Sequence, residues 1–102
     1  MFSFNNIESG ISIKIKAKRF DASVVRQFKA ETENQCPLNT PHIEVDLSEV
    51  GFIDSSGIGA LLSLRERLAK DAENIVIINP RPAVLSIIEL LKLNEIFTLK
   101  RQ

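Results

Sequence analysis

The run from Ile75 to Ile78 is the feature that most constrains the fold of this chain. Its four residues are all apolar and β-branched, a pattern typical of a strand that is buried on both faces. Such strands occur mainly in parallel sheets, whose connecting helices cover the sheet. The run therefore predicts an α/β fold with helices before and after it.

Strand and helix patterns alternate along the rest of the sequence. Residues 11–18 alternate apolar and polar side chains, whereas apolar residues recur at helical spacing after Asp21, Ser56 and Pro82. We expect strands near 2–4, 11–18, 43–47, 75–78 and 97–99, and helices over 21–33, 56–70 and 82–92. Strands separated by helices pair in parallel, and the first two form an antiparallel hairpin. The expected fold is a mostly parallel sheet of about four strands with an antiparallel N-terminal edge and three main helices.

Length and charge narrow the class of protein further. A chain of 102 residues can bury roughly two-thirds of its unfolded surface, so we expect one domain over residues 1–102. Thirteen Lys and Arg residues balance thirteen Asp and Glu residues, and no net field attracts the chain to nucleic acid.

Cysteine and apolar content indicate where the protein works. Cys36 is the only cysteine, which rules out an intramolecular disulfide and a cysteine-rich zinc site and fits a reducing cytoplasm. The N-terminus lacks the pattern of a signal peptide, and no apolar run is long enough to span a membrane. We expect a cytoplasmic protein that inserts in no membrane and needs no metal or cofactor.

The segment Asp54-Ser55-Ser56-Gly57 lies where a strand ends and a helix begins, the edge at which parallel sheets bind ligands and partners. The helix then contains Gly59 and Ala60, and each glycine in a helix costs about 1 kcal/mol relative to alanine. Close approach, either to the sheet or to a partner, would offset that cost. Local chemistry alone favours a simple helix N-cap at this segment.

The segment from Val45 to Leu68 resembles the STAS domains of the anti-sigma factor antagonist (anti-anti-sigma factor) family. The resemblance depends on Asp46-Leu47-Ser48, on the run from Phe52 to Gly57, and on Gly59-Ala60-Leu61-Leu62. It extends upstream to Phe20-Asp21 and downstream to the runs 75–80 and 90–97. One departure is that many members have Gly-Glu where this chain has Lys18-Arg19.

The resemblance implies a bacterial partner-switching regulator of transcription without enzymatic activity. Ser55 would be phosphorylated by a cognate serine kinase that is also the anti-sigma factor, with Ser56 as second candidate, and a PP2C-type phosphatase would reverse the reaction. The unphosphorylated form would bind the kinase, and the phosphorylated form would release it. The protein would be a monomer or a weak homodimer.

A docking surface is expected around the start of the second helix. Its residues would be Asp21, Asp54, Ser55, Ser56, Gly57, Gly59 and Ser63. Asp21 is also the expected N-cap of the first helix, and we expect Phe52 to be buried under the sheet.

Two other functions stay open. One is an accessory STAS subunit of a transport or other signalling complex, like those attached to lipid or anion transport machinery, without phosphorylation. The other is a hydrolase with Ser55 as nucleophile. It is disfavoured because His42 is the only histidine and no Gly-x-Ser-x-Gly motif is present. His42 is instead expected to be a loop residue without a metal.

Overall fold

The computed structural model describes residues 1–68 and 75–102. Helices and strands alternate in the expected order. The elements are β1 (Phe2–Ile7), β2 (Gly10–Ile15), β3 (Arg19–Phe20), α1 (Ala22–Gln35), β4 (Ile43–Asp46), β5 (Phe52–Ile53), α2 (Ser55–Leu68), β6 (Ile75–Ile78), α3 (Pro82–Leu90), the short 3-10 helix η2 (Leu93–Glu95) and β7 (Thr98–Lys100).

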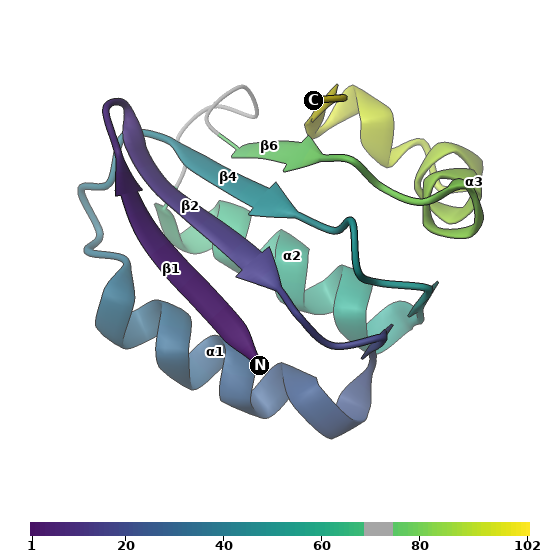
Figure 1. Ribbon diagram of the computed structural model, residues 1–102, viewed down its shortest axis with the longest axis horizontal. Helices are drawn as coiled ribbons and strands as arrows, with labels where there is room; N and C mark the ends of the chain where they lie inside the picture. Colours follow the sequence, from purple (N-terminus) through teal and green to yellow (C-terminus); the bar gives the residue numbers. More distant parts are fainter. Residues whose placement is uncertain (69–74) are drawn as a thin grey trace.

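A five-stranded sheet in the order β1-β2-β4-β6-β7 forms one layer of the molecule (Figure 1). The β1–β2 pair is antiparallel, and the other neighbouring strands are parallel. The mostly parallel sheet with an antiparallel N-terminal edge is thus confirmed. Its five strands lie near the five strand positions expected from the sequence, and β1 continues to Ile7 and pairs along the whole of β2.

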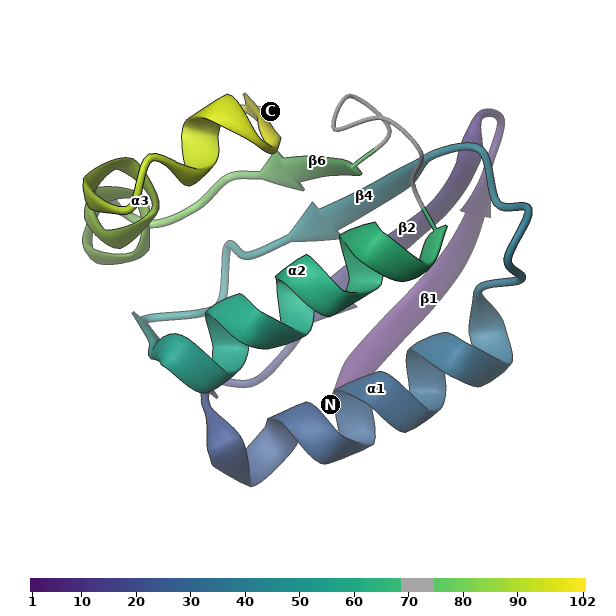
Figure 2. The same ribbon diagram turned by 180° about the vertical axis from the view of Figure 1, so that it is seen from behind.

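Helices α1 and α2 pack side by side against one face of this sheet (Figure 2). The buried residues of α3, Val84 and Ile88, join the same core as Ile13 of β2 and Ile77 of β6. The opposite face of β2 and β4 carries half-buried polar side chains, so these strands have the alternating pattern of a sheet covered on one side. Among the strands that the structure describes, β6 alone is buried at every position, as its apolar run predicts.

The helix ends differ from the expected ones by one or two residues. Helix α1 ends at Gln35, two residues later than expected. It does not continue further because Pro37 follows, and the residue before a proline disfavours helical backbone angles. Helix α2 begins one residue early, at Ser55, and the last two residues of the helix expected over 56–70 lie outside the described residues. Helix α3 ends at Leu90, two residues early, and Lys92 then adopts a left-handed backbone with φ of 58°.

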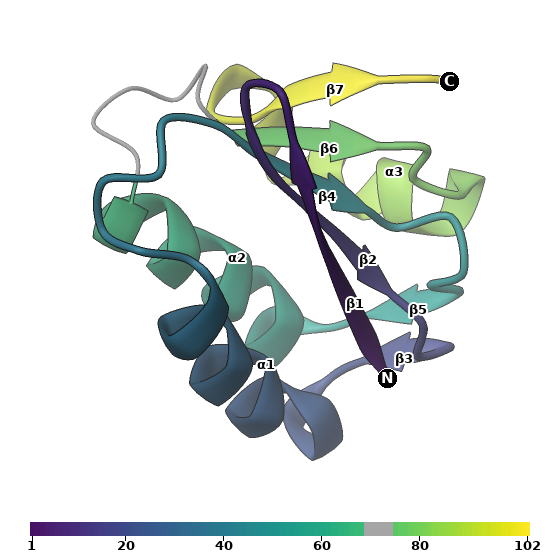
Figure 3. The ribbon, with the colours of Figure 1, turned by 60° about the vertical axis from the view of Figure 1, so that its left-hand side comes forward.

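A second, two-stranded sheet is formed by β3 and β5, which pair in parallel below the main sheet (Figure 3). It begins where the chain leaves β2, which ends at Ile15 and not at residue 18 as expected. Two-residue strands carry no periodic pattern, so the sequence gives no sign of this sheet. The pairing fixes Phe52 and Ile53 against Arg19 and Phe20 and thereby places the start of α2.

No helix within the described residues is both long enough and apolar enough to cross a membrane.

Candidate functional site

Asp54 caps the N-terminus of α2. Its carboxylate Oδ1 accepts hydrogen bonds from the backbone N–H groups of Ser56, at 2.9 Å, and Gly57, at 3.1 Å. Its carbonyl oxygen accepts the first helical bond, from the N–H of Ile58. The N-cap expected from local chemistry is therefore present, and it is supplied by the aspartate and not by a serine.

The two serines that follow Asp54 differ in exposure. Ser55 is the first residue of α2 and is exposed to solvent, whereas Ser56 is half-buried. Backbone N–H groups at a helix N-terminus carry partial positive charge, which favours an anion nearby. Ser55 thus presents its hydroxyl to solvent at a helix end that tolerates negative charge.

Gly57 and Gly59 have opposite surroundings, although only Ile58 lies between them. A Cβ at Gly57 would lie 2.2 Å from the backbone oxygen of Phe20 and 2.8 Å from Cγ1 of Ile53. Gly57 therefore allows α2 to pack against β3 and is buried, unlike the other residues expected in the docking surface. At Gly59 no atom lies within 4 Å of the same position, so the helix backbone faces open space there.

Phe52 is not buried as expected, because its neighbour Ile53 takes the position in the core. Phe52 is 40% exposed, while Ile53 is 1% exposed. The guanidinium carbon of Arg19 lies 4.2 Å from the centroid of the Phe52 ring, a cation–π arrangement. Phe52 is therefore an exposed aromatic residue three positions before Ser55.

Asp21 caps α1, as expected, and connects that helix to Arg19. Its carboxylate accepts a hydrogen bond from the N–H of Ser23 at 3.1 Å and forms an ion pair with Arg19 Nε at 3.0 Å. The hydroxyl of Ser23 and then the Arg19 guanidinium hold the pKa of Asp21 below its usual value. Asp21 therefore stays charged and keeps Arg19 over Phe52.

Ser63 lies two turns further along α2 and lines a cavity of about 130 Å³ between α1 and α2. Arg67 lines the same cavity and donates a hydrogen bond of 2.8 Å to the carbonyl oxygen of Cys36, just after the C-terminus of α1. Burial raises the pKa of the Cys36 thiol, although the charge of Arg67 acts in the opposite direction. Cys36 is thus a buried core residue with an unreactive thiol.

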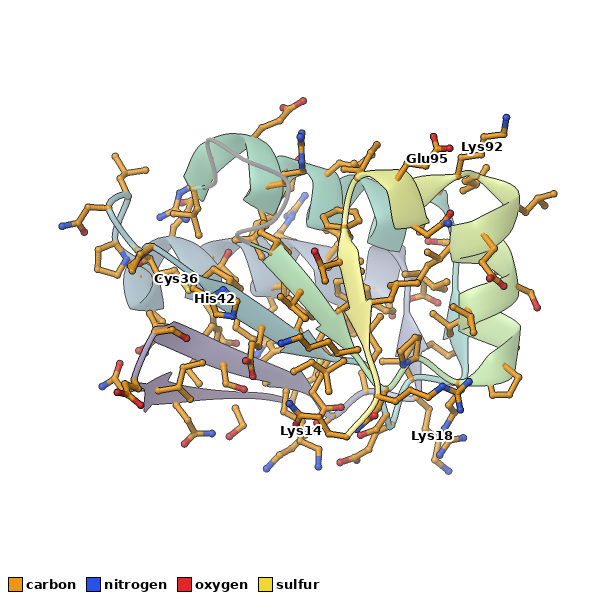
Figure 4. All side chains as sticks on the ribbon, turned by 90° about the horizontal axis from the view of Figure 1, so that it is seen from above. Lys14, Lys18, Cys36, His42, Lys92 and Glu95 are labelled. Atoms are coloured by element: carbon orange, nitrogen blue, oxygen red, sulfur yellow. The ribbon has the colours of Figure 1, made fainter. Side chains whose placement is uncertain are left out.

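His42 is remote from the serines. It precedes β4 and pairs with Glu44 at 3.5 Å, whereas Ser55 follows the loop beyond the other end of that strand. Figure 4 shows His42 close to Cys36, at the opposite end of the molecule from Lys18. A Ser55–His42 pair is therefore absent, and within residues 1–68 and 75–102 no three potential ligands group as a metal site would require.

Sequence reasoning did not bring together three residues that lie at the same edge as Ser55. Arg19 stacks on Phe52, Phe52 is exposed, and Arg81 donates a hydrogen bond of 2.8 Å from Nε to the carbonyl oxygen of Ser48. The Lys18-Arg19 pair was the sign of Arg19, and no sequence pattern pointed to Arg81 or to the exposure of Phe52.

Comparison with solved structures shows which proteins share this fold. The anti-sigma factor antagonist SpoIIAA in its unphosphorylated form matches all of this chain and 88% of its own, with a TM-score of 0.78 and 19% identity. The Bacillus protein SpoIIAA in its phosphorylated form matches 100% of this chain and 91% of its own, with a TM-score of 0.70 and 18% identity. A Thermotoga maritima protein assigned as an anti-sigma factor antagonist matches 99% of this chain and 86% of its own, with a TM-score of 0.81 and 16% identity.

Comparison of sequences identifies the family. No curated protein matches the chain. The family model described as "Mlab, STAS domain" matches residues 12–99, which include the loop before α2 and all three helices. The chain therefore belongs to the STAS domain family.

Proposed function

We propose that this chain, as a single STAS domain over residues 1–102, is an anti-sigma factor antagonist controlled by phosphorylation. It binds a cognate serine kinase that is also the anti-sigma factor, and it releases that kinase when Ser55 is phosphorylated. A PP2C-type phosphatase restores the binding form, and the chain itself catalyses no reaction. The observation that supports this proposal is an exposed serine at the first position of α2, directly after an aspartate N-cap, in a fold shared with SpoIIAA.

Ser55 is the proposed acceptor, and Ser56 is the second candidate. Ser55 is exposed, whereas Ser56 is half-buried and its N–H group is bound to Asp54. A kinase must bring a phosphate donor in line with the hydroxyl that it modifies. The difference in exposure therefore favours Ser55, which local chemistry alone did not.

Phosphorylation would act on binding and leave the fold intact. A phosphoserine carries about −1.5 to −2 charges near neutral pH. At Ser55 that charge would lie beside the carboxylate of Asp54 and inside the docking surface. The carboxylate of Asp54, and not the Ser55 side chain, accepts the hydrogen bonds of the N–H groups that begin α2. The helix therefore does not depend on the Ser55 hydroxyl.

The proposed docking surface consists of Asp21, Asp54, Ser55, Ser56, Gly59 and Ser63. Gly57 is left out because it is buried against Phe20. The open space over Gly59 would let a partner backbone approach α2 closely.

Reaction with ATP and the cognate kinase, followed by mass spectrometry, tests the acceptor. We expect one phosphate on Ser55 in the wild type, none in Ser55→Ala, and an unchanged yield in the matched control Ser56→Ala. Ser55→Ala should bind the kinase constitutively, and Ser55→Asp should bind it more weakly. Full phosphorylation of Ser55→Ala would refute the assignment.

An accessory STAS subunit that is not phosphorylated is the second candidate function. It is favoured by the matching family model, which is described by the name Mlab and not as an antagonist. Phosphate-affinity electrophoresis of the protein from its native cells distinguishes the two. A shifted band that Ser55→Ala removes supports the switch, whereas a single unshifted band under all growth conditions supports the accessory subunit.

A further inference from the structure

Three basic residues surround the segment that leads to Ser55. The carbonyl oxygen of Lys18 accepts hydrogen bonds from the N–H groups of Gly51, at 2.8 Å, and Phe52, at 3.2 Å. Arg19 stacks on the Phe52 ring, and Arg81 Nη1 lies 3.9 Å from the position that a Gly51 Cβ would take. We name Lys18, Arg19 and Arg81 the basic rim. Lys18 directly precedes β3, Arg19 is its first residue, and Arg81 is the N-cap of α3, so the fold brings them together from distant parts of the chain.

The charge of the basic rim is only partly balanced. All three residues are exposed, and Arg19 is ion-paired with Asp21. Within residues 1–68 and 75–102, Lys18 and Arg81 have no ion pair with a carboxylate. The carboxylate of Asp54, next to Ser55, accepts hydrogen bonds from two backbone N–H groups of α2 and forms no ion pair with the basic rim.

Phe52 gives the basic rim an apolar centre that is held in place. Pairing of β3 with β5 fixes its backbone, and the ion pair with Asp21 fixes the Arg19 side chain that covers one side of its ring. In many protein interfaces a few well-packed aromatic and arginine residues contribute most of the binding energy. Little side-chain entropy would be lost on binding because the ring and the guanidinium already pack together.

We propose that the basic rim around Phe52 selects the protein partner and that it binds a surface with carboxylates around an apolar side chain. The apolar side chain would contact Phe52, and the carboxylates would pair with Lys18 and Arg81. The proposal rests on the proposed function, because it assigns a specificity to the docking surface next to Ser55. Partners with basic residues at this place would be repelled by like charge.

A peptide titration followed by amide chemical shifts in NMR tests the chemistry of the basic rim. The probes are capped peptides of sequence Asp-Glu-Leu-Glu-Asp and Lys-Arg-Leu-Arg-Lys. We expect the acidic peptide to shift the amides of residues 18–19, 51–53 and 81, and the basic peptide to leave them unchanged. The double variant Lys18→Glu, Arg81→Glu should bind the acidic peptide about tenfold more weakly, because exposed pairs contribute little singly but repel after charge reversal.

Lys92→Glu is the matched control. It reverses the charge of one exposed lysine on the side of the molecule opposite to Lys18 (Figure 4), and the variant should bind the acidic peptide like the wild type. Equal binding of both peptides, or shifts that lie elsewhere, would overturn the proposal. So would equal loss of binding in Lys92→Glu.

A second experiment separates this proposal from the proposed function. It measures binding of the kinase that phosphorylates Ser55 to the wild type and to the double variant, at low and at high salt. We expect at least tenfold weaker binding of the double variant at low salt and a smaller difference at high salt, because salt screens exposed charges. If Ser55 is phosphorylated and the double variant binds that kinase normally, the basic rim proposal fails while the switch stands.

Discussion

Alanine at Gly57 and alanine at Gly59 should change stability in opposite directions, although both lie in the first half of α2. At Gly59 a Cβ meets nothing within 4 Å, so only the helix propensity changes. Gly59→Ala should raise the free energy of unfolding by about 1 kcal/mol. For a chain of this length that corresponds to a rise in Tm of roughly 4 °C.

At Gly57 the new Cβ would lie 2.2 Å from the backbone oxygen of Phe20 and 3.0 Å from its ring atom Cδ2. The oxygen belongs to β3, which is paired with β5 and cannot move away alone. Overpacking of this kind costs about 3 kcal/mol, the upper part of the usual range. The gain in helix propensity offsets about 1 kcal/mol of that cost, so Gly57→Ala should lose about 2 kcal/mol.

Urea denaturation followed by circular dichroism at 222 nm measures both effects. The chain has no Trp or Tyr, which makes backbone dichroism a better signal than intrinsic fluorescence. The urea midpoint should rise for Gly59→Ala and fall for Gly57→Ala, with unchanged slopes. A destabilised Gly59→Ala variant would refute the view that α2 faces open space there, and an unchanged Gly57→Ala variant would refute the close contact with β3.

The same substitution tests why a costly glycine is present at position 59. If a partner backbone approaches α2 there, the added methyl group should weaken kinase binding even though it stabilises the fold. Equal or tighter binding of Gly59→Ala would remove Gly59 from the docking surface.

Three further predictions concern the helix caps and the cysteine. Asp54→Ala should lower the free energy of unfolding by about 1 kcal/mol in urea denaturation, because two N–H groups at the start of α2 lose their acceptor. Asp21→Asn should lower stability at neutral pH, and the difference from the wild type should shrink in acid. The pKa of Asp21 is lowered in the folded state, so its contribution is complete above the ordinary value of about 3.9 and is lost as the pH falls through the lowered pKa. Denaturation curves from pH 7 down to pH 3 check this, and a constant difference would contradict it. Cys36 should react with Ellman's reagent at least about a hundredfold more slowly in native protein than in 6 M guanidinium, because the thiol is fully buried and burial raises its pKa.

The main sheet and the helices were predictable because each is long enough to show a period. The stripe of apolar residues in α2 and the β-branched run of β6 are both confirmed. The β3–β5 sheet was not predictable, since a strand of two residues has no period and its pairing depends on the distant contact of Arg19 with Phe52.

The site was predictable in its sequence position but not in its surroundings. The motif predicted that Asp54 and Ser55 lie at the start of a helix. In the structure Asp54 caps α2 and Ser55 is its first residue. It could not show that Ile53 and not Phe52 enters the core. Both residues are apolar, and the β3–β5 pairing decides which of the two side chains points into the core. It also could not separate Gly57 from Gly59, since the difference between them lies in the backbone oxygen of Phe20.

Neighbouring residues at the start of α2 have different structural roles. The Asp54 carboxylate accepts hydrogen bonds from the first N–H groups of the helix, and Gly57 allows the helix to pack closely against β3. Ser55, between them, is exposed and is needed for neither task. A modification at that position can therefore change the charge of the surface by nearly two units without removing a bond or contact that the fold requires. This separation fits the proposed function, because a protein that works as a reversible switch must remain folded in both states while only its affinity for the partner changes.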